Sequence, residues 1–136
     1  MTPSQVLKTF KKICVVGLSP DPSRVSHSVS SAMALAGFEI TGVNPTAPQV
    51  ISNWKVYPTL SQVPGTLEIV NVFRQPSAIP ALVDELIPLQ PKVLWLQEGV
   101  YHPEAEEQAR QAGIVVVSDT CIWKILARSS HHSDSL

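Results

Sequence analysis

Charge is scarce in this chain, and no stretch of it is basic. Only 15% of the 136 residues are charged, and the formal net charge is −1. Because proteins that bind nucleic acid present a basic face, this composition argues against a nucleic-acid partner. The apolar runs are too short to cross a membrane, and residues 1–10 hold no apolar signal core. We therefore expect a soluble, cytoplasmic protein with no membrane partner.

Cysteine and histidine are too few and too scattered for a metal site. Cys14 and Cys121 are the two cysteines, and no CxxC or Cys/His spacing typical of zinc is present. A disulfide between them is not expected in a reducing compartment. The four histidines form no HExxH, HxxE or Ser-His-Asp arrangement. With no catalytic set visible, the sequence predicts a protein that is not an enzyme.

The most informative stretch is an apolar run followed by a glycine turn. Residues 13–16 are apolar without alternation, which is typical of a strand buried on both faces of a parallel sheet. Gly17 breaks the run, and residues 19–23 form a polar loop with two prolines. Ser26 is a candidate N-cap for a helix over about 27–36, which Gly37 ends. The stretch therefore predicts a buried strand, a loop and a helix in direct succession.

The same alternation continues along the chain. We expect further strands at 39–44, 55–57, 68–73, 92–96 and 114–117, and further helices at 3–10, 76–89, 103–112 and 120–128. Residues 45–54 are predicted to be irregular, 59–63 to form one helical turn, and 129–136 to be a disordered tail. Such alternation is typical of α/β proteins with a three-layer, doubly wound parallel sheet. The prediction is one Rossmann-like domain over 1–128, with six strands in the order 3-2-1-4-5-6.

The loop after the first strand is the predicted ligand site. In doubly wound sheets, ligands lie beyond the carboxyl ends of the strands, here residues 17–26, 44–45, 73–76, 97–100 and 118–121. A glycine turn that leads into a helix N-terminus presents unpaired N–H groups to an anion. Arg24 adds a planar guanidinium suited to phosphate. We therefore expect this loop to bind the phosphates of a nucleotide-type ligand.

Two common phosphate-binding motifs are absent. A dinucleotide-binding fingerprint needs GxGxxG and an acidic residue at the end of the second strand. Here Ser19 stands where the second glycine belongs, the second strand ends in Asn44, and Glu39 lies at its other end. No GxxxxGK[ST] motif of a P-loop is present either. These departures weigh against NAD, and an NAD(P)-linked oxidoreductase-type domain is kept as the alternative.

Several motifs together carry a family resemblance. They are VVGLS at 15–19, RVS at 24–26, GVNP at 42–45, KVYPTL at 55–60, IVNVFRQP at 69–76, VLWLQEGV at 93–100 and DTC at 119–121. In these motifs the chain resembles small stand-alone CoA-binding proteins of Rossmann type, related to the CoA-binding domain of succinyl-CoA synthetase alpha subunits. Val25 stands where that family usually has proline, and His27-Ser28 where an aromatic residue and glycine are common.

The resemblance implies a ligand, coenzyme A (CoA) or a short acyl-CoA, and assigns roles to particular residues. These residues, at the ends of the strands, fall into groups according to the part of the ligand that each would contact. Gly17 and Leu18 would bring the backbone close to the ligand, and Ser19, Arg24 and Ser26 would hold its phosphates. Asn44 and Pro45 would border the 3′-phosphoadenosine end, and Phe73, Arg74 and Pro76 would line the adenine or pantetheine path. Gln97, Glu98, Gly99 and Val100 would flank the pantetheine arm. The implied protein is a binding module, carrier or sensor, with a second copy or a partner enzyme left open.

Some residues keep two interpretations. Arg24 is either a phosphate ligand or a solvated loop residue, and Arg74 either contacts the ligand or pairs with a nearby carboxylate. Glu98 is a solvated or capping acid, or a general base. His27 is interpreted as a solvated residue at a helix start, with a phosphate contact as its alternative. Cys121, near the start of the last helix, is a structural thiol or a group that exchanges with the CoA thiol or a disulfide.

Overall fold

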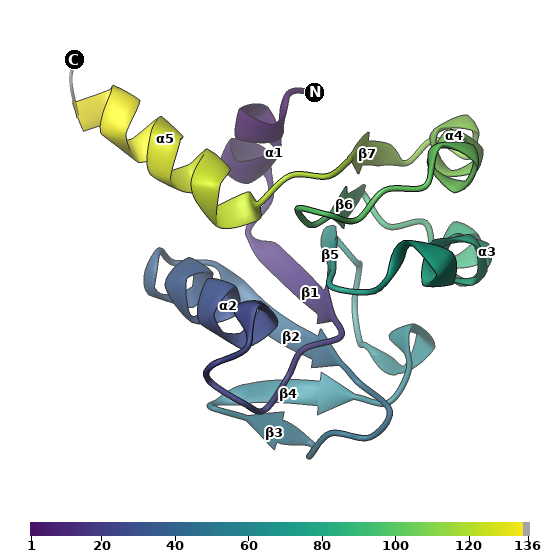
Figure 1. Cartoon of the computed structure of the whole chain (residues 1–136), viewed down its shortest axis with the longest axis horizontal. Helices are drawn as coiled ribbons and strands as arrows, with labels where there is room; N and C mark the ends of the chain where they lie inside the picture. The colour runs from purple at the N-terminus through teal and green to yellow at the C-terminus, as the bar shows by residue number, and fades with distance from the viewer. Residues whose placement is uncertain (135–136) are drawn as a thin grey trace.

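The sheet is the centre of the molecule. The computed structural model describes residues 1–134. Seven strands form one sheet in the order β3-β4-β2-β1-β5-β6-β7 (Figure 1). Their bounds are β1 Lys12–Val16, β2 Glu39–Val43, β3 Val50–Ile51, β4 Trp54–Tyr57, β5 Ile69–Val72, β6 Val93–Leu96 and β7 Val115–Val117. Six of these strands are parallel, in the predicted order, so the predicted fold class is confirmed.

The predicted strand count was one too low, because a short edge strand was missed. β3 pairs antiparallel with β4, Val50 opposite Lys55 and Ile51 opposite Trp54. The two strands are joined by a tight turn in which Ser52 is left-handed, with φ 57°. The sequence predicted an irregular segment at 45–54, because two residues are too few to show a strand period. The sheet is therefore mostly, not wholly, parallel.

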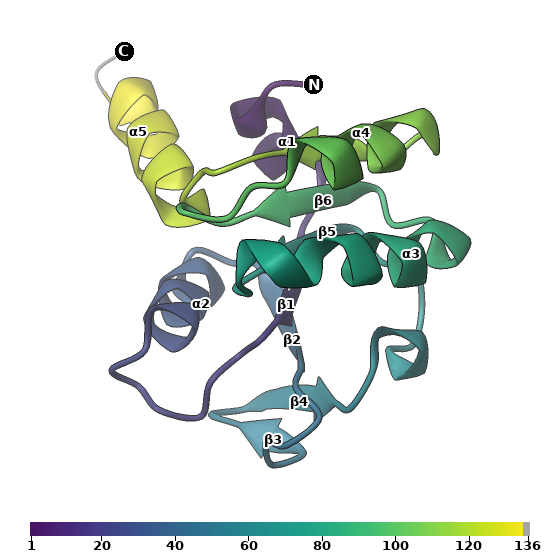
Figure 2. The same cartoon turned by 45° about the vertical axis from the view of Figure 1, so that its right-hand side comes forward.

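Helices cover both faces of the sheet. They are α1 Pro3–Thr9, α2 Val25–Leu35, α3 Ile79–Leu89, α4 Pro103–Gln111 and α5 Ile122–Asp134, with short 3₁₀ turns η1 Leu60–Gln62 and η2 Pro76–Ala78. α1, α2 and α5 pack on one face, and α3, α4 and η1 on the other (Figures 1 and 2). Each face has its own apolar core, because the strands alternate side chains between them. Among the described residues, no helix has the length and apolar character needed to span a membrane.

The helix ends correct two local predictions. At α1, the Thr2 hydroxyl accepts from the Gln5 N–H, and the Gln5 side chain accepts from the Thr2 N–H, which together form a capping box. α2 begins at Val25 with Arg24 as its N-cap residue, so Ser26 lies inside the first turn and is not the N-cap. α5 continues to Asp134 where an end at 128 was predicted, while residues 135–136 of the predicted tail lie outside the described residues.

Trp95, in the middle of β6, links the core to the loop before α5. Its indole is fully buried, and its Nε1 donates to the Thr120 carbonyl at 2.8 Å. Trp95→Phe removes both volume and donor, so we expect a loss of about 2 kcal/mol in the free energy of unfolding. Trp123 is 41% exposed, and Trp123→Phe should cost less than about 0.5 kcal/mol. Urea unfolding followed by circular dichroism measures both, and equal losses would contradict this role of Trp95.

Candidate functional site

Gly17 brings the first loop against the end of β5. The Phe73 N–H donates to the Val16 carbonyl and the Gly17 N–H to the Val43 carbonyl, both at 2.9 Å. Gly17 has φ +88°, and a Cβ there would lie 2.5 Å from the Phe73 carbonyl oxygen. A side chain is therefore excluded by both conformation and space. Glycine at this position lets the chain turn tightly between three strand ends.

Three side chains hold the peptide groups that follow Gly17. Asn44 Nδ2 donates to the Leu18 carbonyl at 2.9 Å. The Ser19 N–H donates to Ser26 Oγ at 3.0 Å, and the Ser19 carbonyl accepts from His27 Nδ1 at 2.9 Å. Because a carbonyl can only accept, His27 Nδ1 must carry a proton. The loop is thereby fixed to the first turn of α2 and to the end of β2.

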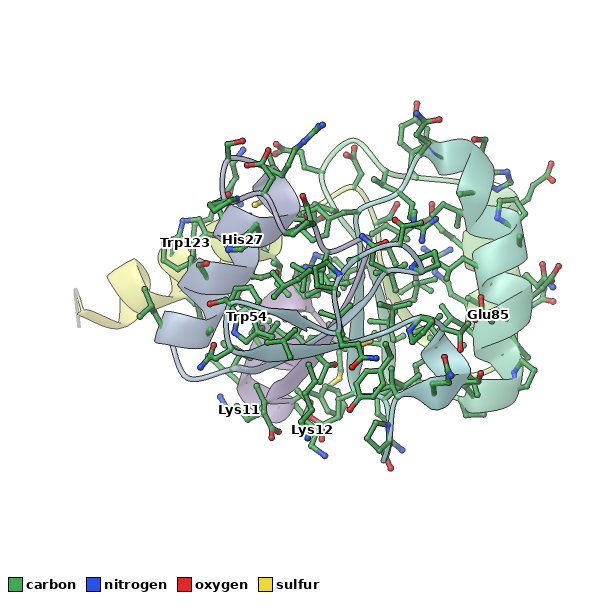
Figure 3. All side chains as sticks on the ribbon, turned by 90° about the horizontal axis from the view of Figure 1, so that it is seen from below. Lys11, Lys12, His27, Trp54, Glu85 and Trp123 are labelled. Atoms are coloured by element: carbon green, nitrogen blue, oxygen red, sulfur yellow. The ribbon has the colours of Figure 1, made fainter. Side chains whose placement is uncertain are left out.

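His27 differs from its prediction. It was interpreted as a solvated residue, but its side chain is buried, and its ring lies 5.4 Å from that of Trp54 (Figure 3). Ser26 is also buried, and Asn44 is half-buried. The structure thus gives Ser26 and Asn44 a loop-holding role in addition to any ligand contact. Sequence reasoning missed His27 because its partner, Ser19, is eight residues earlier and faces it only in the folded loop.

Backbone N–H groups without a protein acceptor lie where the loop meets α2. Among residues 1–134, the backbone N–H groups of Leu18, Val25 and Ser26 donate to no protein acceptor. Two of them belong to the first turn of α2, where the helix dipole favours an anion. Leu18 is fully buried, backbone included, so Val25 and Ser26 in the first turn of α2 carry the amides that face a ligand. These free amides lie in the loop and helix start where the sequence predicted an anion-binding site.

Two arginines stand beside these amides, together with one acid. Arg24 and Arg74 are both exposed, and within the described chain neither forms a salt bridge. Arg74 Nε lies 3.6 Å from where a Cβ on Gly17 would stand, so it lies over the loop. The alternative that Arg74 pairs with a carboxylate is therefore not what the structure shows. The Ser23 N–H and hydroxyl donate to Asp21 and lower the pKa of its carboxyl, which stays anionic beside Arg24.

A groove of about 660 Å³ runs over the ends of β5 and β6, between the starts of α2 and α5. We call it the groove. Its lining includes all the predicted ligand contacts from the second half of the chain, namely Phe73, Arg74, Pro76, Gln97, Glu98, Gly99 and Val100. The rest of the lining is Val25, Gln75, Cys121 and Lys124. A second cavity, the side hollow, measures about 370 Å³ and includes Pro45 and Pro58 in its lining. Arg74 lines both, so the two cavities adjoin at this side chain.

Hydrogen bonds to the segment before α5 and to α5 itself hold the loop that follows β6. The Gly99 N–H donates to Asp119 at 2.6 Å, and Gln97 Oε1 accepts from the Ile122 N–H at 3.4 Å. Glu98 accepts from Lys124 Nζ at 2.8 Å. This bond raises the pKa of Lys124. Glu98 is exposed and paired, which is the environment of a solvated acid and not of a general base.

The comparisons with known proteins decide the family. Residues 11–127 match the family described as "CoA binding domain". The chain belongs to this family. The resemblance that the sequence motifs indicated is therefore confirmed, with the fold it implied.

Relatives of similar length support the assignment. The "Uncharacterized protein YneT" of Bacillus subtilis (strain 168) is 39% identical over 118 residues, which is 87% of each chain. The solved structure of "cell-free ID.343 from Thermus thermophilus" is 32% identical with a TM-score of 0.88, covering 94% of this chain and 98% of that one.

A dinucleotide-forming acetyl-coenzyme A synthetase of Ca. Korarchaeum cryptofilum is 22% identical with a TM-score of 0.70. That match covers 83% of this chain but only 27% of the synthetase, and it shows the fold alone.

The hydrogen bond from His27 can be tested without a ligand. His27→Phe keeps a ring against Trp54 but removes the donor to the Ser19 carbonyl, at a cost of about 1 kcal/mol in loop order. We expect hydrogen exchange of the Ser19 amide, followed by NMR, to accelerate about fivefold. His27→Asn places an amide N–H near the same position and should restore slow exchange. If both variants accelerate exchange equally, packing and not the hydrogen bond holds the loop.

Proposed function

We propose that the chain binds CoA or a short acyl-CoA non-covalently, with the diphosphate at the loop between β1 and α2. One observation carries this proposal: Arg24 and Arg74 stand unpaired beside the free amides of the α2 N-terminus, in a chain of the CoA binding domain family. A diphosphate needs several donors and compensating positive charge at one place. The free amides supply the donors, and Arg24 and Arg74 supply the positive charge.

The two cavities suit the two ends of such a ligand. From the diphosphate, the adenosine end would lie toward Asn44, Pro45 and the side hollow, which is lined mainly by apolar atoms. The pantetheine arm would lie in the groove, past Phe73 and Pro76 to the loop 97–100. Arg74, which lines both cavities, would stand where the ligand crosses from one to the other.

The NAD(P) alternative has less support. Ribose hydroxyls of a dinucleotide are usually bound by an acidic side chain at the end of the second strand. β2 ends at Val43, and the next residue, Asn44, donates its amide to Leu18 and accepts at Oδ1 from Thr46. That amide is already engaged in holding the loop.

The protein is further proposed to act as a carrier or sensor and not as an enzyme. Glu98, a candidate base, is paired with Lys124. Among the described residues, no group of three or more His, Cys, Asp or Glu side chains is placed to hold a metal ion. A catalytic partner that receives the bound CoA is compatible with this role, and co-purification of such a chain would identify it.

Parallel calorimetric titrations test the ligand and the site together. We expect saturable heat with CoA and none with NAD or NADP. Arg24→Gln and Arg74→Gln should each weaken CoA binding about tenfold, because each removes a charge-assisted contact. Arg110→Gln is the matched control, since Arg110 pairs with Glu106 and Glu107 on α4. Binding of NAD with equal strength, or arginine variants that bind CoA like the control, would contradict the proposal.

A further inference from the structure

Cys121 lines the groove, whose lining also reaches the start of α2 beside the phosphate loop. It immediately precedes α5, is half-buried and free, and lines the groove together with the loop 97–100. Val25, the first residue of α2, lines the same groove beside the anion-binding amides. A ligand held by its phosphates at α2 and extended along the groove therefore has its tail near Cys121.

Gln97 supplies a second polar group to the part of the groove wall next to α5. Its side chain is 4% exposed and lines the groove. Its Oε1 accepts from the Ile122 N–H, the residue next to Cys121, while within residues 1–134 its Nε2 has no protein acceptor. This nitrogen is not among the fully enclosed unpaired side-chain atoms of the described residues, so it faces the groove and is free to donate to an acceptor on a ligand. The pantetheine arm of CoA carries amide carbonyls and ends in a thiol.

Cys121 stands at a helix N-terminus with a lysine on the same wall of the groove. α5 begins at the next residue, and Lys124, one turn further along, also lines the groove. Glu98 offsets part of that lysine charge, and Arg128 adds a second positive group on α5. Thiols at helix N-termini near cations are the ones that enter disulfide exchange.

We propose that Cys121 is a modification site that captures CoA covalently when CoA is presented as a disulfide. This inference rests on the proposed function, because the phosphate loop would position the disulfide. The Cys121 thiolate attacks one sulfur of the CoA disulfide, and a bond between Cys121 Sγ and that sulfur forms. The original S–S bond breaks, and the second CoA leaves as a thiolate, which takes up a proton equivalent to the one Cys121 released. The CoA disulfide is itself the oxidant.

Cys14 provides an internal control. It lies on the opposite face of the sheet, is 4% exposed, and burial raises the pKa of its thiol to about 11. A cysteine in that environment is protonated at neutral pH and shielded from a disulfide. The chain thus carries one thiol placed for exchange and one that is not.

Intact-mass spectrometry of the reduced protein with CoA disulfide, without added reductant, is the direct experiment. We expect a mass gain of one CoA less two hydrogen atoms, reversed by dithiothreitol and located at Cys121 by peptide mapping. Cys14→Ser should react like the unaltered protein, and Cys121→Ser should not react. No adduct, or an adduct at Cys14, would overturn the proposal.

Pantethine separates recognition from simple thiol reactivity. It has the same disulfide and arm but no phosphates, so its reaction with Cys121 should be at least about tenfold slower. Equal rates would overturn the proposed positioning. Calorimetry of the fully reduced protein with reduced CoA tests the underlying function separately. Saturable heat without an adduct from CoA disulfide defeats this inference alone, whereas absence of heat defeats the proposed function.

Discussion

The fixed position of the Leu18 and Ser19 peptide groups is the restraint on which the site depends. Gly17 allows the chain to pass close to the Phe73 carbonyl, and Asn44, Ser26 and His27 then hold the loop. Because these bonds use the carbonyls of Leu18 and Ser19 and the N–H of Ser19, the remaining amides stay free for a ligand. A loop already ordered in this way loses less entropy when an anion binds.

The loop adds the negative charge of Asp21 to the positive charges of the two arginines. Asp21 remains ionised within the same loop, since Ser23 donates to its carboxylate. Arg24 therefore acts beside a negative charge, and Arg74, in the segment that follows β5, adds positive charge from a second part of the chain. The proposed ligand, which is strongly anionic, would meet positive charge at the carboxyl ends of two neighbouring strands, β1 and β5. This is the usual position for ligands in doubly wound sheets.

The parts that sequence predicted are those governed by local pattern. Apolar runs gave six strands and their order, the glycine turn located the loop, and the motifs gave the family, which the match over residues 11–127 confirms. What sequence missed depends on contacts between distant segments. β3 is visible only through its pairing with β4. The roles of His27 and Gln97 depend on Ser19 and Ile122, which approach them only in the folded chain. Ser26 was assigned as an N-cap because it fits that pattern, yet it accepts from Ser19 and not from its own helix.

The central claim is that the amides at the start of α2 bind the diphosphate of CoA. Two-dimensional ¹⁵N NMR of the protein titrated with CoA tests it most directly. The account predicts that the amide signals of Val25 and Ser26 shift first and saturate together, while those of α4 stay in place. Loop signals that remain unmoved while the protein binds CoA elsewhere would contradict it.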